Sequence, residues 1–228
     1  MRARAMSERH TDRMRALRAK LAELGERDRN YNIRGARYHR YQSLPAELDD
    51  VRTAEARTGY SLPDQYRDWL LEVGYGAGPD WGLLPLVAER HLQIQMSGTT
   101  TLHKQPMIFD LSAEDRPYPI GEIADISELT PEDCADRIKR DQTFVTAQSA
   151  KGLLAICEAD YGSFDAIVAA GPMRGAIVHW LFDLGAMVYP ETCGAGFWFG
   201  SLDYFTWMET WLDRSLDSLQ SKTKPPRW

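Results

Sequence analysis

The chain has 228 residues, of which 43% are hydrophobic, and its formal net charge is −6 at pH 7. A compact chain of 26.0 kDa would expose roughly 10,500 Å² of the roughly 38,000 Å² that the extended chain exposes, so it can bury a core without disulfides or metals. This composition excludes a disordered chain, and the negative charge argues against a general nucleic-acid-binding protein.

The charge is divided unevenly along the chain. Residues 1–41 hold 12 Lys and Arg but 5 Asp and Glu, a net charge of +7, which leaves −13 on residues 42–228. A basic segment therefore precedes a strongly acidic body. For the basic segment we expect a solvated helix or an oligomer contact, and contact with nucleic acid through its tyrosines is the less favoured alternative.

The sequence predicts neither a metal site nor a catalytic site. Its three cysteines form no C-x-x-C pair, and its five histidines form no pair at metal-binding spacing. Nothing in the sequence points to a base beside Cys193, and His179 is expected to have a structural role. We expect no cofactor. Free thiols, without a secretory signal or a run of about 20 apolar residues, favour a cytoplasmic protein that does not enter a membrane.

Helical periodicity begins near the N-terminus. Apolar residues at helical spacing predict a helix over residues 7–24 that ends at Gly25, followed by an irregular segment to residue 42. Two further helices are predicted, from Pro45 to Gly59 and from Pro63 to Gly74, because proline favours the first turn and glycine the C-terminal end. The residues expected to face the core are Leu44, Leu48, Val51 and Ala54 in the first of these helices and Tyr66, Trp69, Leu70 and Val73 in the second.

The second half of the chain favours strands. A short strand is predicted at residues 82–86, whereas residues 87–143 contain four prolines and show no clear pattern. A final helix is predicted over residues 201–219. This order of elements predicts an α+β fold, in which helices cover a mostly antiparallel strand meander and a helical extension precedes it. Short connections, which favour antiparallel hairpins, join the apolar runs of the meander at residues 153–157, 165–170, 176–182 and 186–189.

Two tryptophans of the final predicted helix, Trp207 and Trp211, lie one helical turn apart and slightly off its aliphatic face. Packing against the rest of the domain is the favoured interpretation. A partner-binding patch is the alternative, because tryptophan is enriched at the energetic centres of protein interfaces.

A longer pattern lies between Glu55 and Leu86, where an acidic helix precedes Gly, Leu-Pro-x-x-Tyr, a glycine-rich loop and a short Gly-Leu strand. This pattern resembles the SUKH superfamily, which includes a yeast cell-wall-assembly regulator and many bacterial toxin-immunity proteins. A strand near Ile156, a Gly171-Pro172 hairpin and the closing helix are also similar to that family. The fold-defining residues of the resemblance are Gly59, Leu62, Pro63, Tyr66, Leu70, Gly74 and Gly82.

The resemblance implies a domain over residues 42–220 with an insertion around residues 87–143. The basic segment, residues 1–41, would precede this domain, and a tail of residues 221–228 would follow it.

The resemblance also implies a non-catalytic binding protein, most often a bacterial immunity protein that neutralises a cognate toxin by direct binding. The acidic body favours a basic partner such as a nuclease toxin, because nucleases hold phosphates on basic surfaces. A regulatory or scaffold protein that binds a cellular partner is the alternative, and an enzyme is the least favoured. The contacts that we expect are exposed acids and aromatics near the loop and the meander: Asp80, Trp81, Glu158, Asp160, Tyr161 and Asp165.

Overall fold

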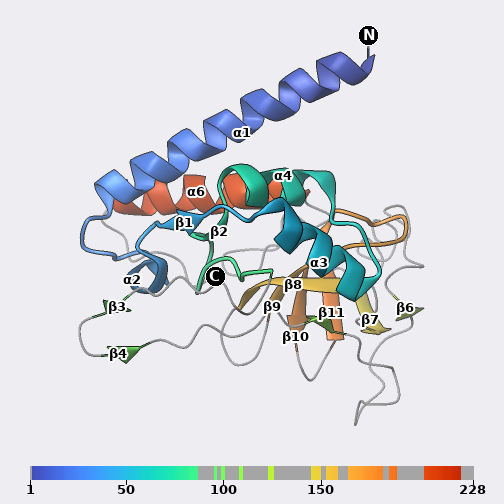
Figure 1. The fold of residues 1–228 in the computed structure, drawn as a ribbon. Helices are drawn as coiled ribbons and strands as arrows, with labels where there is room; N and C mark the ends of the chain where they lie inside the picture. Colours follow the sequence, from blue (N-terminus) through green and yellow to red (C-terminus); the bar gives the residue numbers. More distant parts are fainter. Residues whose placement is uncertain are drawn as a thin grey trace.

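The computed structural model describes residues 2–86, 153–158, 164–181, 185–188 and 203–221, together with short strands between residues 95 and 149. Side chains are described for residues 10–86, 153–157, 165–179 and 203–220. The predicted α+β class is confirmed, since helices α1, α4 and α6 lie together on one side of a seven-stranded sheet (Figure 1). Within these residues, no helix combines the length and the apolar character needed to cross a bilayer. The helices are α1 (Arg2–Arg27), α2 (Ala36–His39), α3 (Leu48–Thr58), α4 (Asp64–Glu72) and α6 (Tyr204–Ser221).

Helix α1 extends beyond both predicted ends. Gly25, predicted to end the helix, lies inside it, and the helix continues for two more residues to Arg27. A Cβ atom at this position would lie 3.3 Å from the Cβ of Tyr41, so a glycine lets the following loop pack closely on the helix. The close packing of this loop on α1 therefore explains the glycine at this position, whereas the predicted helix end does not.

Helix α3 begins later than predicted, at Leu48. Glu47 and Asp50 form a reciprocal capping box at its start, which satisfies backbone donors that would otherwise be unpaired. Leu44 instead belongs to strand β1 (Ser43–Leu44), which pairs with β2 (Tyr75–Gly76). The prediction that Leu44 and Leu48 face the core was wrong, since their exposed fractions are 39% and 41%, whereas Val51 and Ala54 are buried as predicted.

Helix α4 agrees closely with its prediction. Pro63 occupies the N-cap position, and Tyr66, Trp69 and Leu70 are buried in the core. The fold-defining glycines before and after the helix, Gly59, Gly74 and Gly82, all have positive φ, the conformation that glycine adopts most easily. The residues of the resemblance therefore have structural roles.

The sheet confirms the predicted meander and extends it. Strands β8, β9, β10 and β11 are consecutive antiparallel neighbours, as the short connections predicted, and β6 and β7 add a parallel pair at one edge. The predicted strand at residues 82–86 was wrong, because there Leu83 makes isolated bridges to Gly76 and Cys157. The strands of the sheet, in chain order, are β5 (Ile108–Phe109), β6 (Ile123–Asp125), β7 (Val145–Ser149), β8 (Leu153–Glu158), β9 (Phe164–Val168), β10 (Ile177–Leu181) and β11 (Gly185–Val188), and a separate pair is formed by β3 (Gln95–Met96) and β4 (Thr99–Thr100).

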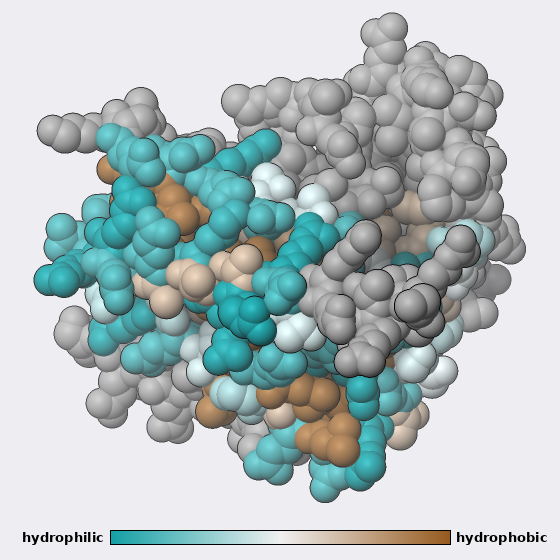
Figure 2. All heavy atoms as spheres, turned by 90° about the horizontal axis from the view of Figure 1, so that it is seen from above, coloured by the Kyte–Doolittle hydropathy of each residue, from teal (hydrophilic) through white to brown (hydrophobic). Residues whose placement is uncertain are grey.

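The basic N-terminal segment contributes to the hydrophobic core. One face of α1 packs on α6, above which it lies in Figure 1, and the two helices share a single cluster of buried residues. Each fully buried leucine contributes about 1.5–3 kcal/mol, so this face holds α1 firmly on the domain. Figure 2 shows the molecule from above the view of Figure 1. The described residues on this face are mostly hydrophilic, with separate hydrophobic patches. The buried apolar residues of α1 are Met14, Leu17, Leu21 and Leu24.

Trp207 and Trp211 of α6 are both fully buried. Their predicted packing role is confirmed, and the alternative of a partner-binding patch was wrong. Helix α6, which carries both rings, packs against α1 and also contacts α4, and the two tryptophans lie on its buried side.

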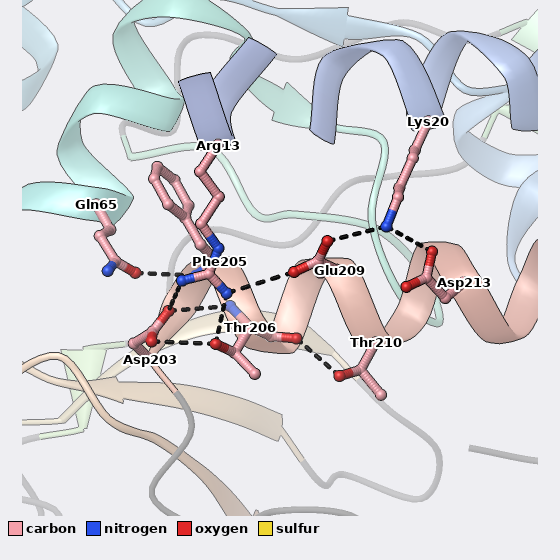
Figure 3. A network of polar contacts seen from close by, with 9 residues as sticks. All are labelled: Arg13, Lys20, Gln65, Asp203, Phe205, Thr206, Glu209, Thr210 and Asp213. Atoms are coloured by element: carbon pink, nitrogen blue, oxygen red, sulfur yellow. Dashed lines mark hydrogen bonds and ion pairs between the residues drawn. The ribbon is translucent and has the colours of Figure 1, made fainter. Parts of the chain in front are cut away.

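Charged pairs flank the apolar contact between α1 and α6 (Figure 3). The Lys20 ammonium lies 2.9 Å from a carboxylate oxygen of Glu209 and 2.7 Å from one of Asp213. The Arg13 guanidinium lies 3.3 Å from Asp203 and 3.5 Å from Glu209. These pairs join the basic segment to the acidic body within one molecule, so the uneven charge of the sequence serves the packing of α1. A further ion pair, between Arg18 and Glu72, reaches α4, and Nε2 of His10 lies 2.9 Å from the Asp68 carboxylate of the same helix.

Candidate functional site

Two loops pack against each other below α1 and contain two of the predicted contact residues. They are residues 28–42, which include α2, and residues 74–82, which include β2; together we call them the double loop. The backbone N–H of Ala77 donates a hydrogen bond of 2.8 Å to the carbonyl of Gln42, which joins the two loops directly.

The first loop folds around one buried carboxylate, that of Asp28, which is 1% exposed. One of its oxygens accepts a hydrogen bond of 2.7 Å from the backbone of Asn32. The other accepts bonds of 2.9 Å from the backbone of Ile33 and 2.6 Å from the Tyr41 hydroxyl. Burial, followed by this bond to Asp28, raises the pKa of Tyr41 far above its usual value. The Asp28 carboxylate, which accepts hydrogen bonds from three residues of the loop, therefore connects the start of the loop to its end.

The second loop is held against the first by Asp80, whose carboxylate pairs with Arg34 at 2.9 Å. The contact also involves the backbone, because a Cβ atom at Gly35 would lie 1.2 Å from the carbonyl oxygen of Asp80. Gly35 has a φ of 77°, so glycine is required there by both conformation and space. Asp80 is 3% exposed and therefore has an internal role, where the sequence predicted an exposed contact.

Backbone strain is concentrated in the double loop. Across the described residues, the four non-glycine residues with positive φ are Tyr31, Arg40, Tyr41 and Asp80, with values between 46° and 58°. Such a conformation costs about 1–3 kcal/mol per residue and persists only where the surrounding structure enforces it. Strained residues of this kind cluster at functional sites, which makes the double loop the strongest candidate in the described part of the chain.

His39 connects the double loop to the core. Its ring is buried, its Nδ1 accepts a hydrogen bond of 3.0 Å from the backbone of Tyr41, and it meets the Trp211 ring edge-on at 6.4 Å. Burial lowers the pKa of His39 to about 4, so the imidazole is neutral at physiological pH. The histidine therefore has a structural role, as part of a neutral contact with α6.

The double loop carries exposed or partly exposed aromatic and arginine side chains. Tyr38 and Trp81, both partly exposed, meet edge-on with ring centroids 4.3 Å apart. The Arg40 guanidinium lies 5.8 Å from the centre of the Tyr31 ring, and Arg37 is exposed. We call these five residues the double-loop surface. Tyrosine, tryptophan and arginine are the residue types enriched at the energetic centres of protein interfaces.

Asp165, another predicted contact, is buried in the sheet. Its carboxylate lies 2.8 Å from Nδ1 of His179 on the neighbouring strand, and its other neighbour in the register is Cys157. The Cys157 thiol donates a hydrogen bond of 2.9 Å to the carbonyl of Pro79, which links the sheet to the double loop. This row of Cys, Asp and His supports the fold, and Asp165 does not reach a partner in this conformation.

The remaining predicted contacts are not placed. Glu158 ends strand β8, but its side chain lies outside the described residues, as do Asp160 and Tyr161. Most of the predicted insertion, residues 87–143, also lies outside them, as do residues 222–228 of the predicted tail, whose first residue, Ser221, ends α6.

A surface cleft of about 320 Å³ lies where three segments of the family resemblance meet. Its walls come from the start of α4, the hairpin turn after Gly171 and the start of α6. Arg174 closes one side by donating a hydrogen bond of 2.7 Å to the carbonyl of Leu62, and Gln65 accepts one of 3.0 Å from the backbone of Phe205. Its polar groups thus connect the three segments to one another.

The described residues contain no group of three or more His, Cys, Asp or Glu side chains that could hold a metal ion. Comparisons with protein-family models, with curated proteins and with solved structures found no match. The resemblance to the SUKH superfamily therefore depends on the residues of this chain alone.

Proposed function

We propose that this chain is a non-catalytic binding protein, a bacterial immunity protein that neutralises a cognate toxin in the cytoplasm by direct binding. The observation that carries the proposal is the double-loop surface, which presents two tyrosines, a tryptophan and two arginines, with Tyr31 and Arg40 themselves on strained backbone. The cost of ordering these loops is met during folding, so less free energy is lost when a partner binds.

The family resemblance supports the same function through the roles of its residues. Pro63 begins a helix, Tyr66 and Leu70 pack in the core, and Gly82 turns the second loop into position. Residues with these roles define a scaffold and leave recognition to the surface that the scaffold supports.

Trp81 and Tyr38 are the expected centre of the contact. Both rings are partly exposed, and each restricts the other through their edge-on contact. Large rigid rings bury much area at low entropic cost, so truncating either one should weaken binding strongly.

The test is rescue of bacterial growth when the protein is expressed together with the toxin encoded beside its gene. We expect the wild-type chain to protect and the double variant Trp81→Ala, Tyr38→Ala to lose protection. Leu48→Ala is the matched control, because it truncates an exposed apolar side chain on α3. Thermal unfolding must show that all variants are folded. Full protection by the double variant would refute the role of the double-loop surface, and loss of protection in the control would do the same.

A further inference from the structure

We infer that the double-loop surface binds an acidic segment of the partner protein, an inference that rests on the proposed function. The sequence around it is locally basic, since residues 26–42 hold five arginines against Glu26 and Asp28. This local charge is opposite in sign to that of the acidic body, from which the sequence predicted a basic partner, so the inference replaces that expectation for the contact made by the double loop.

Burial removes the carboxylates of the double loop from its surface. Asp28 is 1% exposed and is occupied by backbone and tyrosine donors, and Asp80 is 3% exposed and pairs with Arg34. The exposed arginines of the first loop, by contrast, form no ion pair with these carboxylates. Arg37 is exposed and makes no hydrogen bond or ion pair with the described residues, and Arg29 donates to a neutral backbone carbonyl. A partner therefore meets positive charge at this surface.

The geometry suits carboxylates flanked by apolar side chains. An arginine can hold a carboxylate through two parallel hydrogen bonds, which adds specificity as well as energy. The Tyr38 and Trp81 rings, which meet edge-on, provide an apolar contact for the adjacent side chains. We therefore expect a segment in which Asp or Glu alternates with apolar or aromatic residues.

A nucleic acid is the less suitable anion. The chain carries a net charge of −6, which repels a long polyanion, and the double-loop surface offers few free cations. Binding without sequence preference normally needs several phosphate contacts. A short acidic protein segment needs only two or three charged contacts with the aromatic rings beside them.

The experiment measures fluorescence anisotropy of labelled probes with the full chain at low salt. The probes are a short peptide that alternates Glu with Leu and Tyr, the same peptide with Lys in place of Glu, and a single-stranded oligothymidylate. We expect the acidic peptide to bind best, and we expect its affinity to fall about fivefold or more in the variant Arg37→Glu, Arg40→Glu. Arg52→Glu is the matched control, since Arg52 is an exposed arginine on α3.

Each outcome decides the inference. An equal loss of affinity per charge in Arg52→Glu would show a long-range effect of net charge and would overturn it. Tighter binding of the basic peptide or of the oligothymidylate would also overturn it.

If Trp81→Ala, Tyr38→Ala abolishes toxin protection while the acidic peptide fails to bind, the proposed function stands and the inferred charge of the partner segment is wrong. If the acidic peptide binds while the wild-type chain gives no protection, the proposed function falls, whereas full protection by that variant refutes only the role of the double-loop surface.

Discussion

The Tyr41 hydroxyl donates a hydrogen bond of 2.6 Å to Oδ2 of Asp28, across thirteen residues of chain. Asp28 directly follows α1, and Tyr41 lies just beyond α2. One bond therefore closes the first loop of the candidate site and holds it on the end of the N-terminal helix. The conformation of the double-loop surface depends on this buried polar contact.

Replacing Tyr41 with Phe should destabilise the fold without changing its packing. The Asp28 carboxylate would lose its shortest hydrogen bond while remaining buried, so the free energy of unfolding should fall by about 1–3 kcal/mol. Urea-induced unfolding measures this change. Tyr60→Phe is the control, because Tyr60 is partly exposed and its hydroxyl has no partner among the described residues. Equal effects of the two substitutions would contradict the role of the Asp28 contact.

The two glycines Gly35 and Gly59 form a matched pair for testing the contact between the loops. Their φ values are 77° and 75°, but an added Cβ at Gly59 meets nothing within 4 Å, whereas at Gly35 it would overlap the carbonyl of Asp80. Gly59→Ala should cost about 1–2 kcal/mol for the left-handed conformation alone. Gly35→Ala should cost distinctly more, because the two loops must separate. Equal melting temperatures for the two variants would show that the loops are not in contact.

His39 should give the protein a specific sensitivity to acid. Burial lowers the pKa of His39 to about 4, below its usual 6.5, so the unfolded chain binds a proton that the folded chain does not. The free energy of unfolding should therefore rise as the pH increases from 4 to 6.5. In His39→Gln this part of the pH dependence should disappear. An NMR titration in which the His39 imidazole protonates near its usual pKa would contradict the buried placement.

Packing should contribute more than charge to the attachment of α1. Leu17→Ala should lower the free energy of unfolding by about 2–5 kcal/mol, because Leu17 is fully buried against α6. Lys20→Met should lower it by no more than about 1 kcal/mol, since its ion pairs are partly solvated. Chemical denaturation of both variants measures the two losses of unfolding free energy. A larger loss for Lys20→Met would contradict the greater contribution of packing to the attachment of α1.

The ion pairs of Lys20 also predict a pH dependence. The hydrogen bond from Lys20 lowers the pKa of Glu209 below its usual 4.5, although burial partly opposes this. A carboxyl whose pKa is lowered in the folded state adds stability above its unfolded pKa and loses it as the pH falls through the folded value. Glu209→Gln should therefore flatten the loss of stability below pH 4.5. An unchanged acid profile would show that the Lys20 contact is not formed in solution.

Elements with a strong local pattern could be predicted from the sequence. The spacing of Tyr66, Trp69 and Leu70 with Pro63 before them predicted α4, and the apolar runs from residue 153 onward predicted the meander. Errors occurred where a non-local contact overrides local preference. Leu44 continues an apolar helical pattern, but its backbone pairs with Tyr75 and forms a strand.

The candidate site could be predicted only in part. Trp81 was predicted from the sequence as a partner contact. The tyrosines of residues 26–42 were noted as well, but a solvated helix or an oligomer contact was the favoured role of the segment that holds them. The contacts that organise the double loop join Asp28 to Tyr41 and Arg34 to Asp80, pairs far apart in sequence that leave no periodic signal. The density of arginine and tyrosine in residues 29–41 was the available signal for a binding surface.

The most direct test of the proposed interface is hydrogen–deuterium exchange of the protein with and without the toxin encoded beside its gene. We expect toxin to slow the exchange of backbone amides in residues 28–42 and 74–82, and to leave exchange in the turn at residues 171–175 of the cleft unchanged. Slowed exchange confined to that turn, or to the exposed side of α3, would contradict binding through the double-loop surface.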